Sequence, residues 1–469
     1  MNWLYNHSPV WFQNLAISTY GMWVRRIRYG AEHTRQLGEL LSSQAFSATR
    51  LTNLQEQRLR SVVQRAFSQT AYYSAIRKYR SIDPNKIDLG TYASIVPPVS
   101  QALVRRDPAQ FSVPYRGHVM TLQTSGSTGA PIRVKATSAA VATNFAFFAR
   151  FLSWHSVSPF DGCATFAGRL VVPPAQQSPP YWRRNRAMNT TLFSSYRLHD
   201  NTVADYIAEL NRLTPVYIDS YPSSIYHIAE ASRRKGIAIT ARPKVVVTSS
   251  EMLSPDQRWA IETAFECPVR DQYGCAEMVG WLGQCEQGSY HSSPEYGLFE
   301  VIRDDGTACS PGEVGNVCLT GFVNPLMPVL RYLIGDRAAI SDKACRCGRQ
   351  FPVILGLDGR DDDVLITPSG RRVGRVALSL KFASGFRDAQ IIQDAVDHVV
   401  VRVVPDDNAN LPDFTIVVRD LQERLGPDMG IGIQFVDEVE REASGKFRVV
   451  KRLVPREPPL YQDHVSSAP

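Results

Sequence analysis

Several features that define other classes of protein are missing from this sequence of 469 residues. It contains no uninterrupted apolar run of about 20 residues, so no transmembrane span is expected. The first residues lack the charged, apolar and small segments, in that order, of a secretory signal. Internal repeats and long low-complexity tracts are absent, and eight cysteines are too few for a disulfide framework in so long a chain. These absences favour a folded protein in the reducing cytoplasm.

Strong charge of either sign is also missing. Lys and Arg number 52 against 45 Asp and Glu, which gives a formal net charge of +7. The basic clusters at 25–28 and 183–186 accompany no known nucleic-acid-binding motif, so no nucleic acid partner is expected. A mild positive charge remains compatible with anionic substrates such as nucleotides, or with a membrane surface.

The first 27 residues are rich in aromatic and aliphatic side chains. One interpretation is an amphipathic helix that makes a peripheral contact with a membrane or with a partner. The other is a helix that packs on the body of the protein, and this interpretation is favoured.

Apolar periodicity predicts the fold class. Helices are predicted at 51–80, 136–151, 201–213 and 223–235, and short strands at 119–123, 216–220 and 244–248. Residues 158–185 are rich in proline and are predicted to form a loop. Because strands alternate with helices, we expect an α/β fold with a largely parallel sheet.

The pattern changes towards the C-terminus. Residues 295–340 contain short strand-like runs separated by turn signals, which predict a β-rich subdomain. Beyond residue 360, strands are predicted at 399–404 and 414–418, with a helix near Leu421. We therefore expect a large α/β domain over 1–360, which includes the β-rich subdomain, and a small mobile α+β lid domain over 361–469.

The segment directly after the predicted strand at 119–123 consists of hydroxyl side chains and glycines: Thr124, Ser125, Gly126, Ser127, Thr128 and Gly129. Glycines let a backbone approach a phosphate closely, and successive N–H groups and hydroxyls donate to its oxygens. It is not the common phosphate loop, since that loop has a Gly-Lys pair that is missing here. Taken alone, the segment is either a phosphate-binding loop or a plain turn.

Four further motifs follow in order. They are Tyr273-Gly274-Cys275-Ala276-Glu277, Tyr332-Leu333-Ile334-Gly335-Asp336, Gly359-Arg360-Asp361-Asp362-Asp363 and Gly445-Lys446. With these motifs the sequence resembles the adenylate-forming superfamily of acyl-CoA synthetases, and within it the phenylacetate–CoA ligase-like branch. Segments at 8–13, 179–185 and 221–224 resemble members of that branch that are encoded with capsular polysaccharide genes.

The resemblance implies an ATP site spread over two domains. Residues 124–129 would bind the pyrophosphate that leaves, and Tyr273 with Gly274 would lie against the adenine. Asp336 would accept from the ribose hydroxyls, a role that suits an ionised acceptor. Arg360 would also contact the ribose.

The catalytic roles follow from the same resemblance. Glu277 would hold Mg²⁺, and Lys446 would reach the reacting carboxylate and the α-phosphate as a point charge. Asp362 would be the hinge about which the small domain swings between two half-reactions. Cys275 departs from the family motif; a small filler is favoured over a nucleophile because no base lies beside it in the sequence.

A second set of residues has the types that bind metal. Cys285, His291, Cys345 and Cys347 would make a closed tetrahedral site of three thiolates and one imidazole, which suits structural zinc. Gly348 permits the tight turn that such a pair of cysteines needs. Members of the branch that this chain resembles bind zinc at similar positions, whereas the alternative is four unrelated buried residues.

The resemblance implies a cytoplasmic enzyme that uses ATP and Mg²⁺ to activate a small carboxylic acid as an acyl-adenylate and transfers the acyl group to coenzyme A. A second possibility keeps the adenylate but passes the acyl group to an amine or hydroxyl in surface polysaccharide biosynthesis. A third is a catalytically inactive scaffold. The charges of Glu277, Asp336, Arg360 and Lys446 argue against it, because a scaffold has no need of them.

Overall fold

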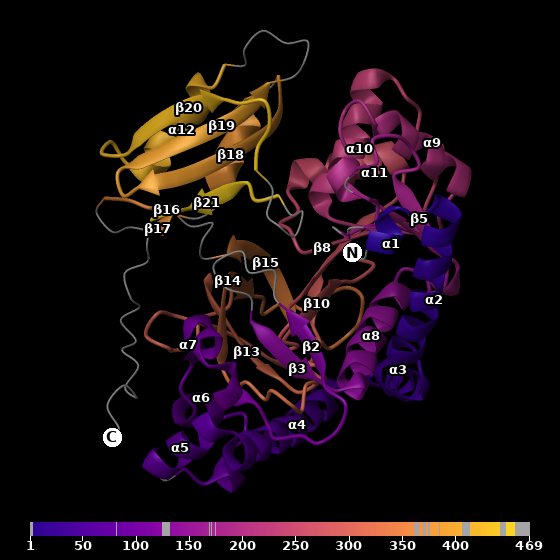
Figure 1. Ribbon diagram of the computed structural model, residues 1–469. Helices are drawn as coiled ribbons and strands as arrows, with labels where there is room; N and C mark the ends of the chain where they lie inside the picture. The colour runs from indigo at the N-terminus through magenta and orange to yellow at the C-terminus, as the bar shows by residue number, and fades with distance from the viewer. Residues whose placement is uncertain are drawn as a thin grey trace.

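The computed structural model describes residues 3–80, 82–123, 132–167, 169, 171–173, 175–360, 365–368, 372–373, 376–383, 385–405, 413–440 and 447–454 (Figure 1). The predicted sites at 124–129, Asp362 and Lys446 lie outside these residues. None of the helices in the described segments is long and apolar enough to cross a membrane.

One large sheet organises most of the chain. Its strand order is β12-β13-β14-β15-β11-β10-β9-β8-β7-β4-β6-β5, and β1 pairs with β14. The strands are β1 (Val99–Ser100), β4 (Cys163–Phe166), β5 (Trp182–Asn185), β6 (Thr190–Phe193), β7 (Tyr217–Ser220), β8 (Val245–Ser249), β9 (Val269–Gly274), β10 (Trp281–Gln284), β11 (Tyr290–Ser292), β12 (Gly297–Ile302), β13 (Gly315–Gly321), β14 (Tyr332–Ile340) and β15 (Val353–Arg360). The middle of the sheet, from β6 through β4, β7 and β8 to β9, is parallel, whereas β10 to β15 pair antiparallel. The predicted α/β class is therefore confirmed.

Helices cover both faces of the parallel strands, as β8 illustrates. Val245 and Val247 pack into a core shared with α8 (Ser138–Ser153) and α3 (Ala31–Ser43), whereas Val246 packs into a core shared with α9 (Val203–Leu213), α10 (Pro222–Lys235) and α11 (Pro255–Phe265). Successive side chains on a strand point to opposite faces, so a continuous apolar run is buried between two helical layers. Figure 1 shows α9 to α11 grouped above β8, with α8, α3 and α2 (Val10–Arg28) below and beside it.

A third group of helices packs on the antiparallel part of the sheet. It comprises α4 (Ala48–Gln69), α5 (Ala71–Arg80), α6 (Tyr92–Ile95) and α7 (Gln101–Arg106). Their core joins Leu59 and Phe67 of α4 to Leu319 of β13 and Tyr332 of β14. The predicted helix at 51–80 is thus two helices, with Thr70 between them.

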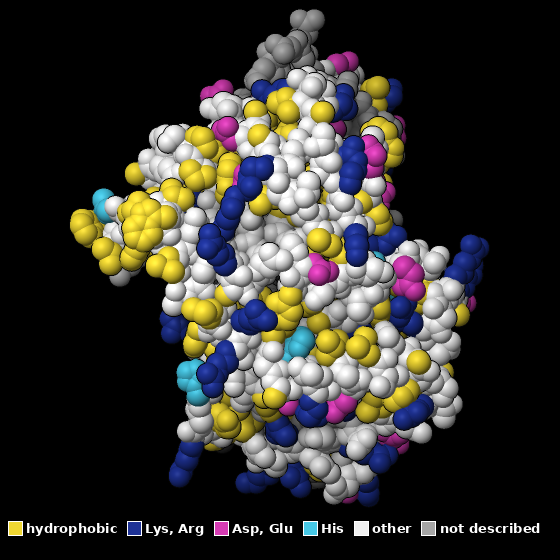
Figure 2. All heavy atoms as spheres, turned by 90° about the vertical axis from the view of Figure 1, so that its right-hand side faces the viewer, with side chains coloured by type: hydrophobic (Ala, Val, Ile, Leu, Met, Phe, Trp, Pro, Cys, Tyr) yellow, Lys and Arg dark blue, Asp and Glu magenta, His cyan; other side chains and the backbone are white. Residues whose placement is uncertain are grey.

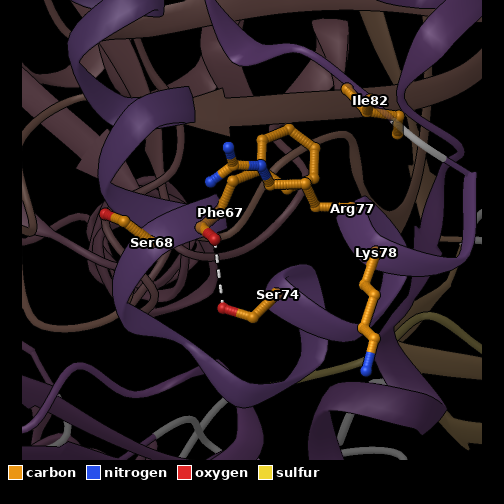
Figure 3. A pocket seen from close by; sticks show the side chains of 6 residues that line it. All are labelled: Phe67, Ser68, Ser74, Arg77, Lys78 and Ile82. Atoms are coloured by element: carbon orange, nitrogen blue, oxygen red, sulfur yellow. Dashed lines mark hydrogen bonds between the residues drawn. The ribbon is translucent and has the colours of Figure 1, made fainter.

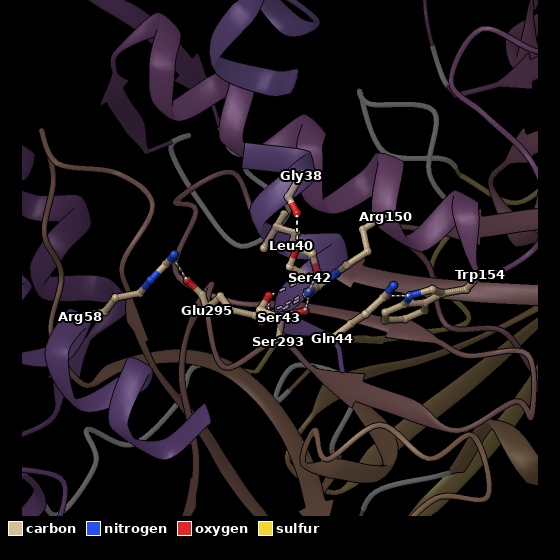
Figure 4. A network of polar contacts seen from close by, with 10 residues as sticks. All are labelled: Gly38, Leu40, Ser42, Ser43, Gln44, Arg58, Arg150, Trp154, Ser293 and Glu295. Atoms are coloured by element: carbon tan, nitrogen blue, oxygen red, sulfur yellow. Dashed lines mark hydrogen bonds and ion pairs between the residues drawn. The ribbon is translucent and has the colours of Figure 1, made fainter. Parts of the chain in front are cut away.

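A buried ion pair fixes α8 to the sheet (Figure 4). The Arg150 guanidinium lies 2.8 Å from a Glu295 carboxylate oxygen, and both side chains are essentially inaccessible to solvent. Arg150 also donates to Ser293 Oγ, and Ser43 of α3 donates to Glu295. Burial alone raises the pKa of Glu295, but the charge and hydrogen bonds of Arg150 and the Ser43 hydroxyl outweigh it and leave the pKa lower than usual.

The C-terminal part has its own sheet and core. Strands β18 (Phe386–Ala395), β19 (His398–Pro405), β20 (Gly430–Phe435) and β21 (Val450–Arg452) pair in the order β20-β19-β18-β21, and α12 (Thr415–Leu425) packs on them. A short pair, β16 (Leu365–Ile366) and β17 (Arg372–Val373), precedes them. Figure 1 shows this unit set apart above the large sheet.

Two sequence predictions are wrong. The stretch 158–185 contains strands β4 and β5 instead of being a loop throughout. The apolar run 414–418, predicted as a strand, enters α12, because Val417, Leu421 and Leu425 recur every four residues and pack together on one helix face. The strands predicted within 295–340 do form, but β12, β13 and β14 continue the large sheet.

Candidate active site

Two carboxylates and two tyrosines from distant parts of the sequence meet beside the large sheet. We call Tyr273, Glu277, Tyr332 and Asp336 the carboxylate cluster. The Tyr273 hydroxyl donates to Asp336 Oδ2 at 2.5 Å, and the Tyr332 hydroxyl donates to Glu277 Oε1 at 2.8 Å. Glu277 is 4% exposed and Asp336 9% exposed. Burial raises the pKa of Tyr273 well above its usual value, and the nearby charge of Asp336 raises it further, so the tyrosine stays a donor.

Unusual backbone conformations surround this cluster. Gly335 has a φ of +89°, and the pairing of β14 with both neighbouring strands shifts register around it. Such a bulge re-aims a side chain, here that of Asp336. Met278 and Arg331, which adjoin Glu277 and Tyr332, also have positive φ, at 57° and 44°. Strained non-glycine residues persist only where packing fixes them, and they gather at functional sites.

The β9 strand that leads to Tyr273 and Gly274 is fixed by a buried carboxylate. Asp271 accepts from the Thr248 hydroxyl at 2.6 Å and from the Tyr290 hydroxyl at 2.5 Å. Burial raises the pKa of Asp271 to about 6, against the opposing effect of these hydrogen bonds. This network ties β8, β9 and β11 together two residues before Tyr273.

Two other predicted parts of the ATP site, Arg360 and the segment 124–129, can be located by the strands beside them. Arg360 pairs with Asp336 across β14 and β15, although its side chain lies outside the described part of the chain. Strand β2 (Met120–Gln123) ends where the predicted phosphate loop begins, and β3 (Arg133–Ala136) pairs with it antiparallel. Burial raises the pKa of the Cys275 thiol, which supports the interpretation of a small filler.

Sequence reasoning missed Glu251, a carboxylate that contacts the C-terminal part of the chain. Glu251 follows the carboxyl end of β8 and accepts from the backbone N–H and the hydroxyl of Ser223, at 2.9 and 3.1 Å. It also accepts from the backbone N–H of Phe447 at 2.9 Å. Glu251 thus joins the large domain to the residue after Lys446. Ligands often bind beyond the carboxyl ends of parallel strands. The position of Glu251 directly after the predicted strand at 244–248 was the only sequence feature that could have pointed to it.

The four predicted metal ligands do converge, and we call them the thiol cluster. Their ligand atoms all lie within 4.8 Å of one another. Cys285 Sγ is 3.7 Å from Cys345 Sγ, and Cys347 Sγ is 3.3 Å from His291 Nε2. A sulfur separation of 3.7 Å is too long for a disulfide but matches the roughly 3.8 Å between two thiolates on a tetrahedral zinc ion.

A tight turn and a hydrogen bond orient the side chains of the thiol cluster. Cys285 follows β10 and His291 lies in β11, while Cys345 and Cys347 lie between β14 and β15. Gly348 has a φ of +83°, and its N–H donates to the carbonyl of Cys345, as the predicted tight turn requires. His291 Nδ1 lies 3.3 Å from the carbonyl of Phe351, which favours the tautomer with its lone pair on Nε2, towards Cys347.

A hollow of about 530 Å³ lies elsewhere, between α4 and α5 (Figure 3). Arg77, Lys78 and Ile82 line it, and the Ser74 hydroxyl donates to the Phe67 carbonyl at its floor. It shares no residue with the carboxylate cluster or the thiol cluster, so it is not part of the candidate site.

Two known proteins and one protein family match the sequence of this chain. Protein CapK of Staphylococcus aureus is 25% identical over 453 residues, which cover 96% of this chain and 98% of that protein. The phenylacetate-coenzyme A ligase of Thermus thermophilus is 30% identical over 159 residues, 32% of this chain and 36% of that protein. The CapK C-terminal domain family matches residues 365–453.

The fold has relatives of known structure. A crystal structure of 2-hydroxyisobutyryl-CoA ligase in the postadenylation state, in complex with R3-HIB-AMP, aligns with a TM-score of 0.65 at 19% identity, covering 87% of this chain and 90% of that one. These matches confirm the resemblance that the five ordered motifs indicated. The chain is a homologue of Protein CapK with the fold of the adenylate-forming CoA ligases.

Proposed function

We propose that the protein activates a carboxylic acid with ATP through an acyl-adenylate and then transfers the acyl group to coenzyme A. In the first step a carboxylate oxygen of the acid attacks the α-phosphorus, a P–O bond forms, and the bond to pyrophosphate breaks. In the second step the thiol sulfur attacks the acyl carbon and AMP leaves. Charge develops on the transferring group, so fixed cations and dipoles accelerate the reaction.

The observation that carries this proposal is the carboxylate cluster. Asp336, oriented by the Tyr273 hydroxyl, would accept from the ribose, and Glu277, oriented by the Tyr332 hydroxyl, would be the ligand of Mg²⁺. Mg²⁺ prefers one or two carboxylates together with phosphate oxygens, and when bound it would neutralise the phosphates. Residues 124–129 would bind the phosphates, and Arg360 and Lys446 would supply positive charge. The proposal is supported by the shared fold, since the 2-hydroxyisobutyryl-CoA ligase of that fold is seen in complex with an acyl-adenylate, R3-HIB-AMP.

We further propose that the small domain begins within 361–364 and turns about Asp362. β15 ends at Arg360, and the match to the CapK C-terminal domain begins at residue 365. Contacts such as Glu251 with Phe447 would hold Lys446 near the large domain for adenylation. They would break when the small domain turns for the transfer step.

The second candidate acceptor is an amine or a hydroxyl, and the long match to Protein CapK is the observation that motivates it. The match to Protein CapK covers 98% of that protein, whereas the match to the phenylacetate-coenzyme A ligase covers 36%. Both acceptors share the adenylation step, so they differ only in the second half-reaction.

Pyrophosphate release over a panel of aromatic and aliphatic acids, with and without coenzyme A, tests the proposal. We expect acid-dependent pyrophosphate from the wild type and its loss in Lys446→Ala. Lys451→Ala is the matched control, because Lys451 lies nearby on β21 and pairs with Glu440. Acid-dependent pyrophosphate without a thioester would favour the alternative acceptor. Release that survives Lys446→Ala would contradict the assignment of the lysine.

We also propose that the thiol cluster binds one structural Zn²⁺. Three thiols and one imidazole complete a tetrahedral shell and leave no position for a substrate. Burial raises the pKa of Cys285 to about 12, so a cation is needed to hold this ligand as a thiolate at neutral pH. Elemental analysis of the purified reduced protein should give one zinc per chain. Less than that, with all four ligands intact, would contradict the proposal.

A further inference from the structure

Helix α2 lies on the body of the protein by one face. Gln13 is buried, and a Cβ atom at Gly21 would collide with the side-chain amide of Asn185. Asn14 accepts from the backbone N–H of Arg184, and Ser18 accepts from that of Arg186, at 2.9 and 3.1 Å. These contacts fix the orientation of the helix, so its other face cannot turn inwards. The prediction that this N-terminal helix packs on the rest of the protein is therefore correct for one face of the helix.

The outward side of α1 (Trp3–Asn6) and α2 is apolar. Seven of the 17 large hydrophobic side chains that are exposed in the described residues lie within residues 3–23: Trp3, Leu4, Trp11, Leu15, Tyr20, Met22 and Trp23. Each of the seven is at least 50% exposed. Trp11, Leu15 and Met22 are spaced by four and seven residues, which aligns them along one stripe of the helix. Figure 2 shows hydrophobic side chains gathered on a projecting edge of this side of the molecule.

The Lys, Arg, Asp and Glu side chains of α1 and α2 are all arginines. No Asp or Glu precedes Glu32, whereas Arg25, Arg26 and Arg28 end α2. Arg26 continues the stripe of Trp11, Leu15 and Met22 by a further four residues and is exposed. Arg184 on β5 and Arg186 just beyond it are exposed as well, and Arg184 pairs with the buried Glu209 at 3.3 Å.

We propose that this outward face of α1 and α2 docks on a lipid bilayer that carries anionic headgroups. Trp and Tyr combine an apolar body with a polar tip and suit the boundary between headgroups and acyl chains. A face with aromatic and aliphatic side chains, bordered by arginines and without acidic groups, has the composition of a helix that lies in the membrane interface. The segment presents only positive charge, which the negative surface of an anionic bilayer complements. The proposal is independent of the reaction catalysed.

Vesicle cosedimentation of the full-length protein tests this inference. The probes are vesicles of phosphatidylcholine alone and of phosphatidylcholine with an equal part of phosphatidylglycerol. We expect binding to the anionic vesicles that weakens as salt is added, and much weaker binding to the neutral ones. Trp11→Ser should lower the partition coefficient about tenfold, and Arg26→Glu at least about fivefold.

Trp259→Ser is the matched control, because Trp259 on α11 is 67% exposed, as Trp11 is. It should bind vesicles as the wild type does, and circular dichroism should show all three variants folded. Equal loss in Trp11→Ser and Trp259→Ser, or no binding of the wild type to anionic vesicles, would overturn the proposal. So would light scattering that shows a dimer which Trp11→Ser converts to a monomer, since a second copy would then cover the face.

Discussion

The carboxylate cluster lies at β9 and β14, and the thiol cluster at β10, β11 and the β14–β15 connection. Both fall within five neighbouring strands of the sheet, yet they are stabilised differently. In the carboxylate cluster each acid already accepts from a tyrosine hydroxyl, so the buried charges have protein partners. In the thiol cluster Cys285 and Cys345 lie 3.7 Å apart and Cys347 lies 3.3 Å from His291, so the ligand atoms stand at the separations that one shared ion allows. A buried carboxylate is costly unless hydrogen-bond donors satisfy it. Thiols packed against an imidazole are stabilised most when they bind one cation together. This difference fits the roles proposed above, a substrate that is bound and released at the carboxylate cluster and a permanent ion at the thiol cluster.

The comparison predicts its largest effect at the thiol cluster. Cys347→Ser should lose zinc and lower the free energy of unfolding by at least about 3 kcal/mol, because structural zinc binding contributes directly to folding. Thermal unfolding and elemental analysis measure this. Cys309→Ser, at a free cysteine in the β12–β13 hairpin, should keep zinc and stability. An unchanged melting temperature in Cys347→Ser would contradict the structural role proposed for the zinc ion.

The thiol cluster also shows what a sequence can reveal. Residue type, spacing and the resemblance to the family singled out four side chains that do converge, because softness and tetrahedral geometry restrict which residues can share an ion. The parallel strands were found because strands buried on both faces are continuous apolar runs, as in Val245 to Val247. The motifs around Tyr273 and Asp336 were found as local patterns, and both lie in the carboxylate cluster.

Other features were beyond the reach of local patterns. The run 414–418 has the same residue types as a strand, and only its packing against the small sheet decides for a helix. Strands β4 and β5 lie at the two ends of a proline-rich stretch that hides them. Glu251 meets Phe447 across 196 residues, and no motif marks such a contact because it depends on how two domains meet.

The next largest effect is expected at the carboxylate cluster. Asp336→Asn should lower kcat/KM for ATP about 100-fold, because a charged acceptor for the ribose becomes neutral. Stability should change little, since Tyr273 can still donate to the amide oxygen. Steady-state pyrophosphate release and thermal unfolding separate the two quantities. Asp342→Asn, at an exposed acid beyond β14, is the control. A variant that loses stability but keeps its kcat/KM would assign Asp336 a structural role instead.

A smaller effect is expected where the two domains meet. Glu251→Ala should slow adenylation about tenfold, because it removes the acceptor for the Phe447 N–H. The transfer step, started from a preformed acyl-adenylate, should keep its rate, and Glu251→Gln should restore part of the adenylation rate because its amide oxygen still accepts. Glu266→Ala, at an exposed acid that pairs with Arg242, should behave as the wild type. Equal slowing of both half-reactions would argue against a role in domain position.

The smallest effect is expected when a tyrosine hydroxyl that donates to a buried carboxylate is removed. Tyr332→Phe removes the donor to Glu277, and Tyr290→Phe removes the donor to Asp271. Each change leaves a buried carboxylate with one hydrogen bond fewer, which costs about 1 kcal/mol. If Glu277 holds Mg²⁺, Tyr332→Phe should raise the Mg²⁺ concentration needed for half-maximal activity by about fivefold, because the oxygen ligand is less well oriented. Tyr290→Phe should lower stability without moving the Mg²⁺ dependence, since Asp271 contacts Thr248 and Tyr290 and neither Glu277 nor Tyr332. Titration of activity with Mg²⁺ for the two variants decides the matter: identical curves would mean that Glu277 acts only as a structural acid.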